Sequence, residues 1–311
     1  MAKVGSDKSR TIADVPMACA DEDAAVAFLE GLRWGDNPGC PRCGDCDVYQ
    51  MQSRNGGRER GYRWRCRGCK QQHTVRTGTV MEDSRIPLRV WCHAYWRAAS
   101  SKKGVSALQI KRETGISYKS ALFLMHRIRW AMSDNGSGML DGQVEADETY
   151  VGPRGRRGSK PGRSTELKTP VFVAIQRGGE VRARVVPNVT GATLKAALRE
   201  TVLPLATIYT DEFGAYRGLD KEFAGHETVS HKRKEYVRGD ATTNTAESFF
   251  AILKRGVIGT YHAISKKHLH RYVSEFEFKW NTRGMDDGAR MRSMIRAGEG
   301  KRLLYRLQTQ V

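Results

Sequence analysis

The sequence contains no apolar run that approaches the roughly 20 residues of a membrane-spanning helix, and no signal segment opens it. Acids are also scarce: 34 Asp and Glu stand against 53 Lys and Arg, a formal net charge of +19 over 311 residues. The lack of apolar runs excludes a membrane-spanning chain and predicts a cytoplasmic protein. The excess of positive charge predicts a polyanionic partner, most commonly nucleic acid, and thus association with the nucleoid.

Cysteine is sparse, and its placement argues against a disulfide framework. The seven cysteines are an odd number and cluster early in a large chain, whereas disulfide-rich proteins are small and secreted. Four of them form two CxxC pairs, Cys40–Cys43 and Cys66–Cys69, with 22 residues between the pairs. Two thiolates in a tight turn hold one edge of a zinc tetrahedron, and a second pair closes it. The spacing therefore predicts a zinc ribbon with one structural Zn²⁺.

The other three cysteines are not predicted to bind this metal. Cys46 lies near the first pair, where it either replaces a ligand or is a bystander, and we favour the bystander. Cys19 and Cys92 are expected to be structural. Between Arg54 and Arg76, basic residues far outnumber acids, so the ribbon is predicted to bind DNA phosphates. The alternative is a basic face that contacts only solvent.

Hydrophobic periodicity divides the chain into an N-terminal helical and loop-rich part and a C-terminal α/β part. In the first part, helices are expected over 21–34 and 87–132, with loops over 37–78. The predicted strands are Val144–Val151, Val171–Gln176, Arg182–Val186 and Ala206–Thr210, and the later helices are Thr193–Thr201, Thr245–Arg255 and Lys266–Trp280. The expected segments are a flexible tail (1–20), a helix and zinc ribbon (21–80), a helical domain (81–138), an α/β domain (139–285) and a basic tail (286–311).

Residues 105–122 show the pattern of a helix-turn-helix. Ser106 and Ser117 are suited to cap two short helices, and Gly115 allows the turn between them. The side chains expected to point inward are Leu108, Ile110, Ala121, Leu122, Met125 and Ile128. The basic side chains expected on other faces, within reach of DNA, are Lys119, His126, Arg127 and Arg129. The alternative is a plain helical connector whose apolar stripe only fills the core.

Two acids lie towards the ends of predicted strands. In the strand Val144–Val151, alternation places Asp147 on the same face as Glu145. Asp211 follows the apolar run Ala206–Thr210 and stands at the C-terminal end of its strand, where α/β sheets place their ligands. The adjacent acids that are alternatives to these two are Glu145, Glu148 and Glu212.

A third acid, Glu247, begins a predicted helix and shares one helical stripe with Asn244 and Lys254. A helix laid beside the sheet would bring Glu247 to Asp147 and Asp211. Two Mg²⁺ or Mn²⁺ ions about 4 Å apart need carboxylates from several directions. Lys254 is placed to hold a phosphate. The constellation predicts metal-dependent phosphoryl transfer, and the alternative is that each acid is an ordinary surface residue.

Several strings together resemble the DDE transposases of bacterial insertion sequences, in the group with an N-terminal zinc ribbon. They are Val144–Gly152, Tyr209–Glu212, Tyr236–Asp240, Asn244–Phe250, Leu253–Gly256, Gly259–His262 and the two CxxC pairs. The resemblance extends over residues 25–283. It implies an α/β fold with a ribonuclease H-like mixed sheet flanked by helices, preceded by a zinc ribbon and a helix-turn-helix-like domain. The implied activity is Mg²⁺-dependent strand cleavage and strand transfer in DNA transposition.

The resemblance makes Asp147 the first catalytic acid and Asp211 the second. The third is Glu247 or Asn244, and Glu247 is preferred because a carboxylate binds a hard cation better than an amide. Lys254 matches the basic residue seven positions later. The implied partner is double-stranded DNA, both the terminal inverted repeats of the element and the target, and joining two ends predicts a homodimer on DNA. The alternatives are a zinc-ribbon DNA-binding regulator without catalysis and a nuclease of the same fold.

Overall fold

The computed structural model describes residues 18–133, 138–152, 168–229 and 243–304. The chain divides into two compact units, one of Met1–Met132 with Met285–Val311 and one of Ser133–Gly284. The expected tail over 1–20 and the string Tyr236–Asp240 lie wholly or mostly outside the described residues. Across the described helices, no span has the length and apolar character needed to traverse a bilayer.

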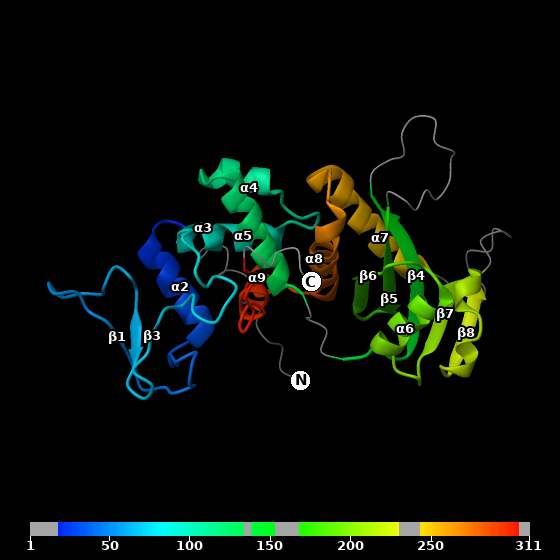
Figure 1. The fold of residues 1–311 in the computed structure, drawn as a ribbon, viewed down its shortest axis with the longest axis horizontal. Helices are drawn as coiled ribbons and strands as arrows, with labels where there is room; N and C mark the ends of the chain where they lie inside the picture. Colours follow the sequence, from blue (N-terminus) through cyan, green and yellow to red (C-terminus); the bar gives the residue numbers. More distant parts are fainter. Residues whose placement is uncertain (1–17, 134–137, 153–167, 230–242, 305–311) are drawn as a thin grey trace. The chain divides into compact units, whose positions relative to one another are not determined.

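The first unit combines a small sheet with helices. Asp21 caps helix α2 by accepting a hydrogen bond from the Ala24 N–H. The three short strands form an antiparallel sheet in the order β1-β2-β3, of which Figure 1 labels β1 and β3. The elements are α2 (Glu22–Trp34), β1 (Val48–Gln50), β2 (Trp64–Cys66), β3 (Gln72–His73), α3 (Leu88–Ser100), α4 (Ala107–Thr114), α5 (Tyr118–Ala131) and α9 (Asp287–Arg296).

Helices α4 and α5 begin and end where the helix-turn-helix pattern predicts. The Ser106 side chain accepts from the Gln109 N–H and the Ser117 side chain from the Ser120 N–H. Gly115 ends α4 at φ 75°, in the left-handed region that glycine adopts without strain. The predicted caps and turn are therefore confirmed.

The side-chain assignments on these helices were partly wrong. Leu108 is 48% exposed, whereas Ile110 is buried as predicted. Three of the four basic residues expected to face DNA are buried, and they are His126, Arg127 and Arg129. Arg127 donates to the Glu82 carbonyl at 2.8 Å. Helix α5 contacts α3, α4 and α9, so most of its circumference faces protein. Of the four basic residues, Lys119 near the N-terminus of the helix remains exposed.

The segment 286–311, expected as a basic tail, contains helix α9. Asp286 caps this helix by accepting from the Ala289 N–H. Met291, Met294 and Ile295 are buried at helical spacing, and α9 packs against α3 within the same unit. Methionine and isoleucine at i, i+3 and i+4 give an apolar stripe that the surrounding arginines obscure in the sequence.

The second unit contains a five-stranded sheet in the order β6-β5-β4-β7-β8 (Figure 1). Strand β4 pairs antiparallel with β5 and parallel with β7, β5 pairs antiparallel with β6, and β7 pairs parallel with β8. The elements are β4 (Gln143–Val151), β5 (Thr169–Gln176), β6 (Val181–Val185), α6 (Gly191–Thr201), β7 (Thr207–Asp211), β8 (Gly225–Val229), α7 (Asn244–Gly256) and α8 (Leu269–Asn281). This is the ribonuclease H-like mixed sheet, and the fold class is confirmed.

Helices cover both faces of the sheet. One face carries Val144 and Ala146 and packs with α6. The opposite face carries Val173 and Ile175 and packs with α7 and α8. Because side chains alternate along a strand, Glu145 and Asp147 of β4 lie on the α7 face. Strand β8 was not predicted, since its sequence has no apolar run; pairing with β7 forms it.

Candidate active site and zinc centre

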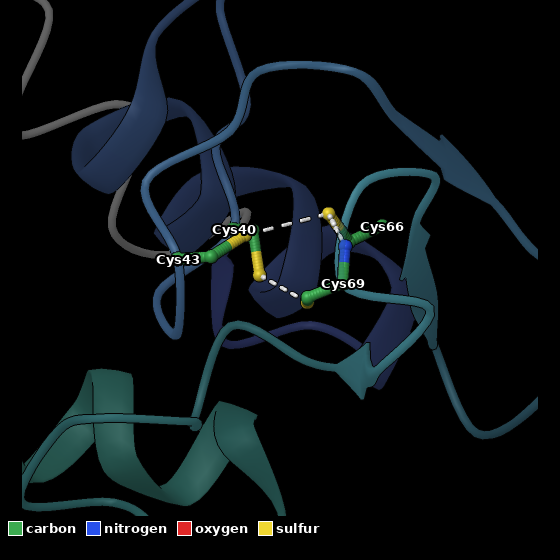
Figure 2. Close-up of side chains that lie close together, drawn as sticks. All are labelled: Cys40, Cys43, Cys66 and Cys69. Atoms are coloured by element: carbon green, nitrogen blue, oxygen red, sulfur yellow. Dashed lines mark hydrogen bonds between the residues drawn. The ribbon is translucent and has the colours of Figure 1, made fainter.

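The four cysteines of the two CxxC pairs come together in the first unit. The Sγ atoms of Cys40 and Cys69 are 3.7 Å apart and those of Cys43 and Cys66 are 3.6 Å apart, and all four lie within 4.8 Å of one another (Figure 2). Zinc bonds of about 2.3 Å in a tetrahedron place sulfurs roughly 3.8 Å apart. The donor set therefore fits one structural Zn²⁺ with all its positions filled by protein.

The rest of the ribbon supplies little apolar burial. Within residues 37–78, Cys40, Cys66 and Val75 are the buried hydrophobic side chains. Gly68 lies against the Asp45 carboxylate, so that a side chain at position 68 would require Asp45 to move. Cys46 is exposed and lies outside the four-sulfur group, as predicted.

In the second unit, two of the predicted acids occupy matching positions on neighbouring parallel strands. Strand pairing aligns Glu145 of β4 with Tyr209 of β7. Asp147 lies two residues after Glu145 on β4, and Asp211 lies two residues after Tyr209 on β7. Asp147 accepts the Glu148 N–H at 2.7 Å, and Asp211 accepts the Phe213 N–H at 3.0 Å. Both carboxylates thus stand at the C-terminal edge of the parallel pair, the edge where such sheets bind ligands.

Asp147 is mostly shielded from solvent and lies within the electrostatic reach of three other acids. Burial raises the pKa of Asp147, a hydrogen bond from the Glu148 N–H opposes the rise, and the charges of Glu148, Asp211 and Glu247 add to it, so that the pKa is about 7. Within the described residues, neither Asp147 nor Asp211 forms an ion pair with Lys or Arg. Negative charge is therefore concentrated around Asp147 and Asp211, and neither carboxylate is paired with a basic side chain of the described residues.

The acids are spaced more widely than the cysteines. Among the described residues, the cysteine group is the one whose ligand atoms all lie within 4.8 Å of one another. Two ions about 4 Å apart, each about 2 Å from its oxygen ligands, accept carboxylates that are farther apart than this. In donor type the acid group suits hard cations, because carboxylate oxygen is the ligand that Mg²⁺ prefers.

The neighbouring acids have other partners. Glu148 accepts a hydrogen bond from the Tyr216 hydroxyl at 2.9 Å. Burial and the charge of Glu148, followed by those of Asp147 and Asp211, raise the pKa of Tyr216 well above its ordinary value, so it stays a donor. Glu212 is exposed beside Asp211. Glu145 is buried and hydrogen-bonded to the start of α7.

Helix α7 carries the remaining predicted residues on its exposed side. Asn244 and Glu247 lie in its first turn and are exposed. Lys254 is also exposed, with its Nζ 5.9 Å from the centre of the Phe250 ring. Seven residues of helix place Lys254 about 10 Å along the axis from Glu247.

Two family models match the chain, one in each unit. The ISXO2-like transposase domain matches residues 139–281, and the transposase zinc-ribbon domain matches residues 20–72. An uncharacterized protein in transposable element ISH50 of Halobacterium salinarum is 32% identical over 273 residues, which cover 83% of this chain and 90% of that protein. The chain belongs to the ISXO2-like transposase family. An uncharacterized transposase-like protein of Haemophilus influenzae is 33% identical over 97 residues, 31% of this chain and 77% of that protein.

Family membership confirms the broad part of the prediction. A transposase acts on DNA, so the positive charge has the nucleic-acid partner it indicated. The zinc ribbon is matched both by sequence and by the sulfur geometry. Sequence reasoning missed what Glu145 and Tyr216 do, because their partners lie many residues away along the chain.

Burial of Asp147, together with the charges of the acids near it, predicts a measurable destabilisation of the protein in the absence of divalent metal. Asp147 has a folded-state pKa of about 7 against an ordinary 3.8, so the folded state binds more protons between these values and loses stability as pH rises through that window. Asp147→Asn removes the charge and should stabilise the second unit at pH 8 by up to about 4 kcal/mol. Thermal unfolding in zinc-replete, Mg²⁺-free buffer measures this.

The stabilising effect should shrink towards pH 4, where Asp147 is protonated in the folded state and about half protonated in the unfolded state. Asp220→Asn, at an exposed acid of the same unit, is the matched control and should leave the unfolding temperature unchanged. An Asp147→Asn protein that is less stable than wild type at pH 8 would contradict the electrostatic account.

Proposed function

We propose that this transposase cleaves the phosphodiester bond at the ends of its element and joins the freed 3′-hydroxyl to target DNA, using two Mg²⁺ or Mn²⁺ ions held by Asp147, Asp211 and Glu247. The observation that carries the proposal is the convergence of negative charge on Asp147 from β7 and α7, without a cationic side chain among its described partners. Such a group is costly unless cations complete it.

The metal ions, when bound, would activate the attacking oxygen and stabilise charge on the leaving oxygen. The protein's own residues supply position. Asp147 and Asp211 define one edge of the site from fixed positions in the sheet, and Glu247 approaches from the helix. Lys254 binds a substrate phosphate. Asn244 is the alternative third ligand, and it is less suited because an amide is a weaker donor to a hard cation.

The reaction then has two in-line steps at phosphorus. Water attacks the phosphodiester at the transposon end, and the 3′-oxygen leaves with a proton as a 3′-hydroxyl. That hydroxyl attacks a phosphodiester in the target, forming the new bond as the target 3′-oxygen leaves. No covalent protein intermediate is required, so the enzyme contributes orientation and charge stabilisation.

In this proposal the first unit binds the DNA. Its exposed basic side chains on the helix-turn-helix are Lys111, Arg112 and Lys119, and on the ribbon Arg60, Arg65 and Arg67. Lysine and arginine at these sites neutralise phosphates and give salt-dependent binding. Since two transposon ends are joined in one event, we propose a homodimer on DNA.

The test uses labelled terminal-repeat DNA, unlabelled target DNA and Mg²⁺ or Mn²⁺ with the full-length protein. The transposase proposal predicts labelled products joined to the target. Nicked DNA without joined products would instead establish a nuclease of the same fold. Bound but intact DNA at every metal concentration would establish a non-catalytic DNA-binding regulator.

A further inference from the structure

We propose that Glu145 is a positioning residue that holds the start of α7, and with it Glu247, in register with Asp147. This inference rests on the proposed function of the acid site. Glu145 is buried, with 1% of its surface exposed, yet it lies on the face of β4 that also carries Asp147. A buried carboxylate beside a group of converging acids needs compensation, and its hydrogen bonds show where that comes from.

Helix α7 has no cap from its own N-terminal residue. The side chain of Thr243, which precedes the helix, makes no capping hydrogen bond. The free N–H groups of the first turn are instead satisfied by Glu145, whose Oε2 accepts from the Thr245 N–H at 2.8 Å and the Ala246 N–H at 3.1 Å. A carboxylate in this place also interacts favourably with the positive end of the helix.

The other carboxylate oxygen of Glu145 is equally occupied. Its Oε1 accepts from the Thr245 hydroxyl and from Arg177 Nε, each at 3.0 Å. A carboxylate has about four lone-pair sites, and all four are used. Glu145 therefore has no oxygen free for a cation, which removes it from the candidate metal ligands and leaves it a role in placing others.

The same contacts link every element that carries a candidate metal ligand. Glu145 is two residues from Asp147 on β4, and Thr245 is two residues from Glu247 on α7. Arg177 connects Glu145 to β7. Its guanidinium lies 4.2 Å from the centre of the ring of Tyr209, which is two residues before Asp211 on that strand. One partly buried network of hydrogen bonds and charge thus sets the relative positions of the three acids.

Glu145→Gln is the informative variant. Glutamine has the same size as glutamate, but one of its two terminal groups is an NH₂ donor instead of an acceptor oxygen. This NH₂ would face N–H groups or the guanidinium, which are themselves donors. The first turn of α7 should loosen and Glu247 should lose its fixed position. Substitutions of residues that orient metal ligands typically weaken metal binding about 10- to 100-fold, and we expect a loss of this size.

The experiment measures Mn²⁺ binding to the full-length, zinc-loaded protein by electron paramagnetic resonance of the free ion. Asp147→Asn identifies the Mn²⁺ bound at the acid site. Glu275→Gln is the matched control, because Glu275 is also a buried, hydrogen-bonded glutamate of the second unit but contacts Lys279 and Tyr261 instead of the start of α7. Glu145→Gln should bind Mn²⁺ 10- to 100-fold more weakly, and Glu275→Gln should bind it like wild type.

Unchanged Mn²⁺ affinity in Glu145→Gln would overturn the inference while leaving the proposed function intact. Equal losses in Glu145→Gln and Glu275→Gln would also overturn it, because general destabilisation would then explain both. If wild type has no Mn²⁺ site that Asp147→Asn removes, the proposed metal chemistry fails and the inference with it. Should Glu145→Gln not fold, Thr245→Val removes one of the four bonds, and it must weaken Mn²⁺ binding several-fold for the inference to stand.

Discussion

Replacing Asp147 or Asp211 by asparagine should abolish cleavage of terminal-repeat DNA while leaving DNA binding intact. Each substitution removes a charge that converges on the same site, and with it transition-state stabilisation of several kcal/mol, which corresponds to a rate loss of about a thousandfold or more. Binding should persist because the basic helices and ribbon belong to the other unit. Single-turnover cleavage and gel-shift titration on the same preparations measure the two effects.

The matched control for this pair is Glu212→Gln. Glu212 is an exposed acid directly after Asp211, so it tests whether any loss of negative charge near the strand end is enough to stop the reaction. It should cleave within a few-fold of wild type. Near-normal cleavage by Asp147→Asn or Asp211→Asn would show that the assignment of that acid is wrong.

Removing zinc should unfold the ribbon without unfolding the second unit. Residues 37–78 bury few apolar side chains, so the metal provides most of the stabilisation, and structural zinc in such small domains contributes roughly 10 to 16 kcal/mol. Protein purified without chelator should contain about one zinc per chain. A strong chelator should abolish the dispersed amide signals of the ribbon in NMR spectra and leave those of the five-stranded sheet.

Two cysteine variants sharpen the zinc prediction. Cys66→Ser removes a sulfur of the four-atom group and should lose the metal, whereas Cys46→Ser changes an exposed thiol outside that group and should retain it. A folded ribbon in zinc-free protein, or loss of zinc in Cys46→Ser, would contradict the assignment of the ligands.

Local patterns in the sequence were enough to predict the zinc ligands, the helix-turn-helix and most strands of the sheet. Each depends on a pattern within one short segment: two cysteines in a turn, a serine before a helix, or a continuous apolar run in β5. The resemblance added the order of the domains and the ribonuclease H-like fold. The catalytic roles of Asp147, Asp211 and Glu247 stay a prediction, which the asparagine substitutions test.

What the sequence did not predict depends on distant contacts. Glu145 has the same chemistry as a surface glutamate, and its role follows only from hydrogen bonds to residues 100 positions away. Arg129 and His126 are buried because α5 is enclosed by three helices. Strand β8 forms beside β7 despite polar residues along its length. Burial of a polar group cannot be inferred from spacing, since it depends on which other elements supply partners.

The most direct test of the account is a crystal structure of the full-length protein with Mn²⁺, in which anomalous scattering locates the ions independently of the side chains. The account predicts Mn²⁺ at the C-terminal edge of β4 and β7, coordinated by carboxylates of Asp147, Asp211 and Glu247, with Glu145 still bound to the start of α7. Anomalous peaks elsewhere, or saturating Mn²⁺ with none of these carboxylates coordinated, would contradict it.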